Sequence, residues 1–156
     1  MRIPGNLRVV IAADHGGVRM KADLLDFLTG KGVAVRDIGT NSEDPVDYPD
    51  YGFAAAESIR RGDADRAILI CKSGIGMAIA ANKAIGIRAA LVSSVETAEL
   101  SRRHNDANVL VLSADEISTE RVRAIVGMWL STPFDGGRHS RRVDKIRAFE
   151  TSHWKE

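Results

Sequence analysis

The amino-acid sequence predicts an α/β fold, in which five parallel strands form one doubly wound sheet and a further helix follows at the C-terminus. Short apolar runs rich in Ile, Leu, Val and Ala recur along the chain. Each run is followed by a stretch whose apolar residues repeat with helical spacing. Strands that are apolar on both faces and alternate with helices are typical of a parallel sheet covered on both sides.

The first strand and helix unit begins with a strand at 8–13, continues through the turn Asp14-His15-Gly16-Gly17, and enters an amphipathic helix. Four further units follow, at 33–38 with 51–59, 66–71 with 76–84, 89–92 with 95–103, and 109–112 with a helix that ends near Leu130. Thr132-Pro133 stops this last helix, because the residue before a proline disfavours helical geometry. Five units in series predict a sheet of the Rossmann-like or flavodoxin-like kind.

The chain length of 156 residues is the usual size of one domain, so we expect a single domain over 1–156 with a core at about 8–132. Residues 138–150 carry Val143, Ile146 and Phe149 at helical spacing, with basic residues between them. This segment predicts a terminal helix that docks on another surface. The one substantial loop is expected at 40–49, which is rich in Asp, Ser, Asn and Pro.

The composition excludes several classes of partner. The 22 basic residues nearly balance the 21 acidic ones, so no bulk field gathers nucleic acid or an anionic membrane. The chain has no apolar run near the roughly 18 residues of a membrane span, and no charged-then-apolar leader follows Met1. A single cysteine can form no internal disulfide and no multi-cysteine metal site. We therefore expect a cytoplasmic protein with neither nucleic-acid nor membrane partners.

Ligands of open parallel sheets bind outside the carboxyl ends of the strands. Three segments of this chain are predicted to lie there: Asp14-His15, the loop end at Asp47-Tyr48, and residues 71–76. The third segment carries Ser73, Gly74 and Gly76 where a strand turns into a helix, so that backbone N–H groups can cradle an anion. It lacks the Lys-Ser/Thr ending of a P-loop.

The only cysteine, Cys71, opens the glycine-rich segment beside Lys72 and just ahead of a helix N-terminus. Both neighbours favour a reactive thiolate. The alternative is structural, because a lone cysteine is often a small buried apolar residue. The residues themselves leave both interpretations open.

Two other groups also carry two interpretations, and a third is placed only by its position in the chain. Asp14 and His15 either belong to a site or serve as a helix cap and a surface turn residue. The basic run Arg138, His139, Arg141 and Arg142 is either a solvated face or a phosphate grip, since Arg138 and Arg142 share one helical face. His104-Asn105 end a predicted helix just before the last strand. That position is at the amino ends of the strands, away from the predicted cradle.

Seven sequence blocks resemble those of ribose-5-phosphate isomerase B and its relatives, which include galactose-6-phosphate isomerase subunits. The resemblance runs in order over about residues 8–148. The blocks are DHGG at 14–17, DYP at 47–49, CKSGIGM at 71–77, AANK at 80–83, GIRA at 86–89, RHNDAN at 103–108 and GGRH at 136–139.

The resemblance implies an aldose–ketose isomerase of a small sugar phosphate that works through an enediolate with no cofactor and no metal. It implies that Cys71 moves a proton between C1 and C2, that Ser73 holds the C1 oxygen, and that the N–H groups around Gly74 and Gly76 stabilise the enediolate. Some relatives use a glutamate six residues after the cysteine position, where this chain has Met77.

The resemblance also assigns the groups that handle the rest of the sugar. Asp14 and His104 resemble the pair that opens the sugar ring, and Asn105 resembles the group that binds sugar hydroxyls. His15, Arg138 and Arg142 resemble a phosphate clamp, with Tyr48 as a wall of the pocket. The family builds its site across a dimer interface, so a second subunit is expected to supply His104-Asn105. We expect a homodimer or a dimer of dimers.

Lys72 departs from the family pattern, which usually has glycine at this position in enzymes acting on ribose 5-phosphate. The lysine either helps to hold the thiolate or shortens the space for the sugar. Ribose 5-phosphate is the expected substrate, and a four-carbon phosphate, interconverted between erythrulose 4-phosphate and erythrose 4-phosphate, is the alternative. A non-catalytic sugar-phosphate sensor on the same fold is a third hypothesis, because fold does not fix function.

Overall fold

A computed structural model describes residues 2–154 and contains one sheet of five strands, all parallel. The strand order across the sheet is β2-β1-β3-β5-β4. The strands are β1 (Arg8–Ala13), β2 (Ala34–Asp37), β3 (Arg66–Cys71), β4 (Ala89–Leu91) and β5 (Val109–Ser113). The predicted fold class is confirmed.

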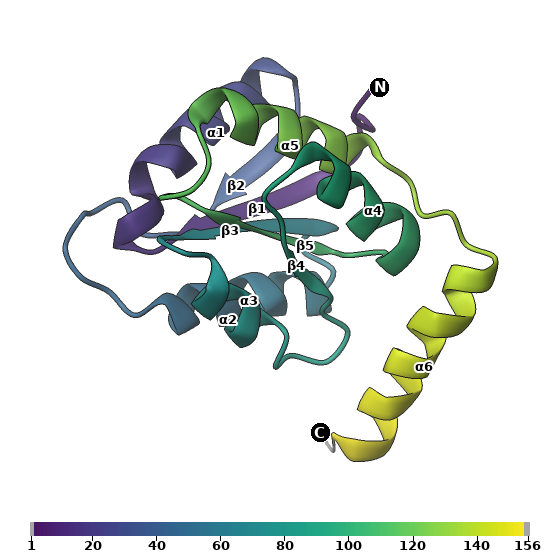
Figure 1. The fold of residues 1–156 in the computed structure, drawn as a ribbon. Helices are drawn as coiled ribbons and strands as arrows, with labels where there is room; N and C mark the ends of the chain where they lie inside the picture. The colour runs from purple at the N-terminus through teal and green to yellow at the C-terminus, as the bar shows by residue number, and fades with distance from the viewer. Residues whose placement is uncertain (1, 155–156) are drawn as a thin grey trace.

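The helices cover both faces of the sheet, as Figure 1 shows: α1, α4 and α5 lie on one face, and α2 and α3 on the other. They are α1 (Val18–Gly30), α2 (Tyr48–Arg60), α3 (Ile75–Ala81), α4 (Val95–Asn105), α5 (Thr119–Ser131) and α6 (Arg138–His153). None of the described helices is long and apolar enough to span a membrane.

The core forms two apolar layers because the three central strands are apolar on both faces. Ile68, Ile70 and Leu112 pack toward α1 and α5, where Trp129 is fully buried. Their neighbours Leu69 and Val111 pack toward the alanines of α2 and α3 on the other side. Each such aliphatic side chain contributes roughly 1.5–3 kcal/mol on burial, so the layers hold the strand ends in fixed register.

The order of the last two strands was not predictable from alternation alone. In the flavodoxin-like order β4 precedes β5, whereas here β5 lies between β3 and β4. All five residues of β5 are buried. The three residues of β4 are partly or fully exposed, which suits the edge of the sheet.

The start of α2 and the end of α3 differ from the predicted bounds. Helix α2 begins at Tyr48 instead of residue 51, because Pro49 is favourable in the first turn of a helix. Helix α3 is shorter than predicted and ends at Ala81. Helix α5 ends at Ser131, just before Thr132 adopts an extended conformation ahead of Pro133.

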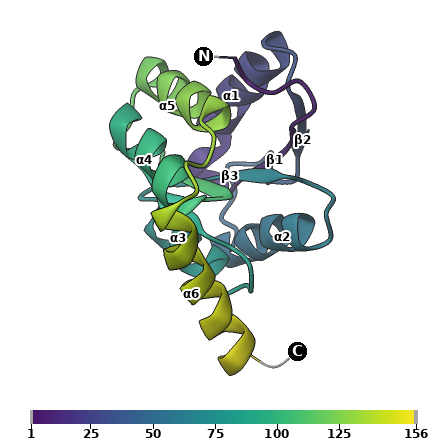
Figure 2. The ribbon, with the colours of Figure 1, turned by 90° about the vertical axis from the view of Figure 1, so that its right-hand side faces the viewer.

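Helix α6 projects from the rest of the molecule (Figures 1 and 2) and extends to His153, beyond the predicted end at residue 150. Its buried residues are His139 and Val143, both near its start. Farther along, Ile146 is 48% exposed and Phe149 is 59% exposed. The predicted docking of this helix is therefore made within the chain mainly by its first turns, with a further hydrogen bond from Gly86 N–H to the Glu150 carboxylate at 3.1 Å.

Candidate functional site

The carboxyl edge of the sheet brings Asp14 and Cys71 together, because they end neighbouring strands. The N–H group of Asp14 donates to the carbonyl of Ile70 at 3.2 Å. One residue further along β3, the carbonyl of Cys71 accepts from Ala114 N–H at 3.0 Å. Main-chain bonds thus fix both residues to the rigid centre of the sheet.

The turn after β1 lies directly against the segment after β3. A Cβ placed on Gly16 would be 2.7 Å from Cγ of Lys72, so only glycine permits this approach. The Lys72 carbonyl in turn accepts from the Ser113 hydroxyl at 2.7 Å. Lys72 therefore lies beside the Asp14-His15 turn, where a change in its side chain alters the space next to that turn.

Cys71 is buried, with 5% of its surface exposed. The burial fits the interpretation of Cys71 as a small apolar residue, whereas its place at the carboxyl end of a central strand fits a chemical role. Met77, the position where some relatives carry glutamate, is fully buried. Cys71 is therefore the more accessible of these two positions to a ligand.

The glycine-rich segment has the shape expected of a cradle. Gly74 has φ +76°, and a Cβ there would also lie 2.4 Å from Cδ1 of Leu91. The Ser73 hydroxyl accepts from Ile75 N–H at 3.3 Å. A Cβ on Gly76 would come within 2.6 Å of Cζ of Tyr48, so the tyrosine ring rests directly against the segment.

Asp14 is a cap as well as a site candidate. Its Oδ1 accepts from Gly16 N–H at 2.9 Å and caps the short 3₁₀ turn His15–Gly17. The alternative that it caps the first long helix is wrong, because Gly17 occupies that position of α1. The cap holds the buried carboxylate in a fixed orientation at the edge of the sheet.

His15 is oriented by the loop before α2. Its Nδ1 accepts from Val46 N–H at 3.2 Å, so a neutral ring carries its hydrogen on Nε2. The loop itself is tied to the core by buried Lys21, whose Nζ lies 2.6 Å from Asp37 and 2.7 Å from Asn41. This arrangement places one ring N–H donor, Nε2–H of His15, at the carboxyl edge, where it is suited to bind an anion.

The remaining candidates lie at the opposite, amino edge. His104 and Asn105 end α4, Arg138 begins α6, and Arg142 lies one turn later. The four steps of β5 from Val109 to Ser113 already separate the two edges by roughly 13 Å, far beyond hydrogen-bond reach. One chain therefore does not bring Cys71 together with His104, or His15 together with Arg138 and Arg142.

The amino edge contains one more candidate, His139, which the sequence showed only as part of a basic run. Its ring stacks on that of His104, with centroids 4.2 Å apart and planes 8° from parallel. Burial, His104 and the nearby arginines Arg138 and Arg142 lower the pKa of His139 below its usual value. The sequence pattern at Gly137-Arg138-His139 does not indicate this stack.

His104, His139 and Asp135 place ligand-type atoms within 4.8 Å of one another. A histidine binds metal through a lone pair that lies in the plane of its ring. Two rings stacked face to face cannot both direct such a lone pair at one ion. Asp135 instead pairs with Arg103 at 3.1 Å, which lowers the pKa of its carboxyl group. The two stacked rings are therefore poorly arranged to bind one metal ion together.

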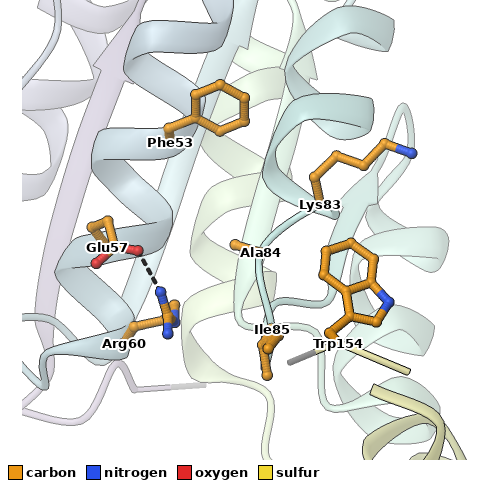
Figure 3. Close-up of a pocket in the computed structure, with 7 residues that line it drawn as sticks. All are labelled: Phe53, Glu57, Arg60, Lys83, Ala84, Ile85 and Trp154. Atoms are coloured by element: carbon orange, nitrogen blue, oxygen red, sulfur yellow. Dashed lines mark hydrogen bonds and ion pairs between the residues drawn. The ribbon is translucent and has the colours of Figure 1, made fainter. Parts of the chain in front are cut away.

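Each edge of the sheet has a hollow that includes a predicted site residue. One of about 360 Å³ at the carboxyl edge includes His15, and one of about 350 Å³ at the amino edge includes Asn105. A third, of about 430 Å³, lies between α2 and the α3–β4 connection (Figure 3). It contains no predicted site residue, and its acidic group Glu57 is paired with Arg60 at 2.6 Å.

Comparisons with known proteins agree with this geometry. A sequence profile described as Ribose/Galactose Isomerase matches residues 9–146. YwlF of Bacillus subtilis, whose name states only the broad class of sugar phosphate isomerase, is 42% identical over 145 residues, which cover 92% of this chain and 97% of the relative.

Two solved structures are similar over nearly the whole chain. Ribose-5-phosphate isomerase B of Clostridium thermocellum has a TM-score of 0.92 and 44% identity, covering 94% of this chain and 99% of that chain. Ribose-5-phosphate isomerase B of Mycoplasma genitalium, solved with bound ribulose 5-phosphate, has a TM-score of 0.89 and 41% identity, covering 94% of this chain and 97% of that chain.

Proposed function

The chain belongs to the Ribose/Galactose Isomerase family of sugar phosphate isomerases, and from this premise we propose that it converts ribose 5-phosphate to ribulose 5-phosphate. The observation that carries the proposal is the placement of Cys71 at the end of β3, fixed beside Asp14 and followed by a glycine cradle. The ribulose 5-phosphate bound to the Mycoplasma genitalium relative supports a five-carbon substrate.

The first chemical step opens the sugar ring. A base takes the proton of the C1 hydroxyl, the bond between C1 and the ring oxygen O4 breaks as the C1 carbonyl forms, and an acid protonates O4. Asp14 and His104 are the two groups proposed for these proton transfers. Asn105 binds the sugar hydroxyls beside them.

The second step moves a proton between carbons. The Cys71 thiolate takes the proton from C2, and the electron pair forms the C1–C2 double bond of an enediolate with its charge on O1. Ser73 and the N–H groups of Gly74 and Gly76 stabilise that charge, and one such donor is typically worth about 3–4 kcal/mol. The thiol returns the proton to C1, and the hydrogen of the O2 hydroxyl moves to O1.

The phosphate is held away from the reacting carbons. The Nε2–H of His15 and the guanidinium groups of Arg138 and Arg142 form the proposed clamp, with Tyr48 as the pocket wall. Arginine suits this role because its planar fork matches phosphate oxygens. Every step uses side chains and the backbone alone, so the mechanism requires no cofactor or metal.

Such a site needs a second copy of the chain, because its groups lie at opposite edges of one sheet. The partner's His104, Asn105, Arg138 and Arg142 would meet this chain's Cys71 and His15. Ile146 and Phe149, exposed along α6, provide an apolar face for that association. Phe53 and Trp154, exposed beside the hollow of Figure 3, offer a further surface for a dimer of dimers.

The alternative substrate is a four-carbon phosphate, which the position of Lys72 favours. The aliphatic part of Lys72 lies against Gly16 beside the catalytic turn, where it takes space that a longer sugar needs. Erythrose 4-phosphate also needs no ring opening, since its phosphate occupies the oxygen that would close a five-membered ring.

The experiment is a steady-state assay of the purified protein against four-, five- and six-carbon aldose phosphates. Ribose 5-phosphate should give the highest kcat/KM. A higher value for erythrose 4-phosphate would transfer the assignment to the four-carbon substrate. Binding without turnover and without deuterium uptake from heavy water would contradict isomerase activity and indicate a sensor.

A further inference from the structure

We propose that His139 is a positioning residue for His104, whose imidazole it holds in place by stacking. The inference rests on the proposed function, in which His104 transfers a proton during ring opening. His139 itself would touch no reacting atom. Its contribution is to fix the direction of the His104 ring.

The stack joins two helices. His104 is the second-last residue of α4, and His139 is the second residue of α6. Their ring centroids are 4.2 Å apart and their planes differ by 8°. His139 is only 7% exposed, whereas His104 is half-buried and faces the amino-edge surface. The buried ring of His139 is therefore the fixed member of the stack, and the partly exposed ring of His104 is the one available to a substrate.

His139 contacts His104 through the face of its imidazole ring. Nδ1 of His139 is buried and has no hydrogen-bond partner among residues 2–154. A role through a hydrogen bond from this nitrogen thus has no support in the described residues. Contact between aromatic rings is favourable beyond the area that it buries, so the pair needs no hydrogen bond from this nitrogen.

Burial and the charges around the pair lower the pKa of His139. Arg138 and Arg142 of α6 and His104 of α4 disfavour a second positive charge there, and Asp135 before α6 favours one. Asp135 is already paired with Arg103 of α4. Burial adds to the arginines in lowering the pKa of His139.

Orientation matters because proton transfer requires donor and acceptor within about 2.6–3.2 Å. A misplacement of about 1 Å can reduce a rate roughly 100-fold. His104 lies at the end of its helix, where the chain turns at Asp106 with φ +48°. Without the stack, its ring would be free to adopt other rotamers at this surface.

The test compares His139→Ala with His139→Phe, which restores a flat ring without a titrating nitrogen. Two reactions separate ring opening from proton transfer at carbon. Isomerisation of ribose 5-phosphate requires the ring to open, whereas deuterium exchange at C1 of ribulose 5-phosphate starts from an open chain. His139→Ala should lower kcat for ribose 5-phosphate about 10- to 100-fold and leave the exchange rate within about twofold.

His139→Phe should recover most of the lost isomerisation, since stacking is retained. His153→Ala is the matched control, because it removes the other stacked histidine of α6, which lies 4.1 Å from Phe149 and far along the helix from His104. It should change neither reaction. Equal losses in both reactions, or no recovery with His139→Phe, would overturn the positioning role.

Nuclear magnetic resonance provides a readout that is independent of activity. The carbon-bound ring protons of His104 should show an upfield ring-current shift in the wild-type chain and in His139→Phe, and lose it in His139→Ala. A His104→Gln variant identifies those signals. An inactive wild-type chain that shows the shift would refute the proposed function while the stack stands. An active His139→Ala chain with unchanged kcat would refute the inference alone.

Discussion

The two edges of the sheet present their chemistry in different ways. At the carboxyl edge, Asp14 and Cys71 are buried and held by main-chain hydrogen bonds to neighbouring strands. At the amino edge, Asn105, Arg138 and Arg142 are exposed on helix ends. The difference indicates that one edge is preorganised by the sheet, whereas the other displays its groups outward, where the proposed second copy of the chain would meet them.

Ion pairs nonetheless hold the backbone of the amino edge in place beneath its exposed side chains. Asp106, which follows Asn105, is paired with Arg88 at 3.1 Å and with Arg102 at 2.9 Å. Arg102 is itself buried and also donates to the Ala107 carbonyl at 2.6 Å. Removal of one partner from such a buried pair is strongly destabilising. The network therefore fixes the backbone from which His104 and Asn105 project.

The largest expected effect comes from removing the proposed base, which lies at the carboxyl edge. Cys71→Ala should lower kcat about 10²- to 10⁴-fold, the usual contribution of a general base. Binding of a phosphorylated aldonate analogue should stay within a few fold, because the thiol is proposed to act in the transition state. Calorimetry and steady-state kinetics measure the two quantities. Cys71→Ser is the matched control for packing, and substantial turnover in Cys71→Ala would contradict the assignment.

The next prediction tests whether the two edges meet across subunits. Cys71→Ala and His104→Ala chains, each inactive alone, should regain activity when mixed and allowed to exchange subunits. Each hybrid dimer has one intact site and one doubly damaged site. If half of the dimers are hybrids, about one quarter of wild-type activity is expected. No recovery after verified exchange would count against a shared site.

A smaller effect is expected from Lys72, which lies at the carboxyl edge against Gly16. Lys72→Gly should raise kcat/KM for five-carbon relative to four-carbon phosphates by about tenfold, the scale of a changed pocket contact. Lys72→Met keeps most of the length of the side chain without its charge and should retain the wild-type preference. If Lys72 instead stabilises the thiolate, both variants should slow alkylation of Cys71 at neutral pH with the sugar preference unchanged.

The smallest effect concerns pH and the amino-edge stack. The pKa of His139 is lowered in the folded chain, mainly by burial, from 6.5. As pH falls below that value, the unfolded chain binds more protons at this position, so the free energy of unfolding should decrease. The phenylalanine variant of this position lacks that contribution. Urea unfolding at several pH values should show wild type losing stability relative to His139→Phe on acidification, and parallel curves would contradict neutral burial.

The sequence by itself determined the fold class and the local chemistry. The alternation of fully apolar strands with helices predicted the parallel sheet, because such strands must be covered on both faces. The carboxyl-end rule placed Asp14, Tyr48 and Cys71–Gly76 near one another, and their measured contacts agree. It also placed His104-Asn105 at the opposite edge, where the structure has them.

Only the tertiary structure decided the relations that depend on distant contacts. The position of β5 between β3 and β4 depends on which strand buries both faces. The approach of Lys72 to Gly16 and the stack of His139 on His104 join segments far apart in the sequence. Periodicity and motifs report which face a residue shares with its near neighbours, whereas these contacts are set by how complete elements pack against one another.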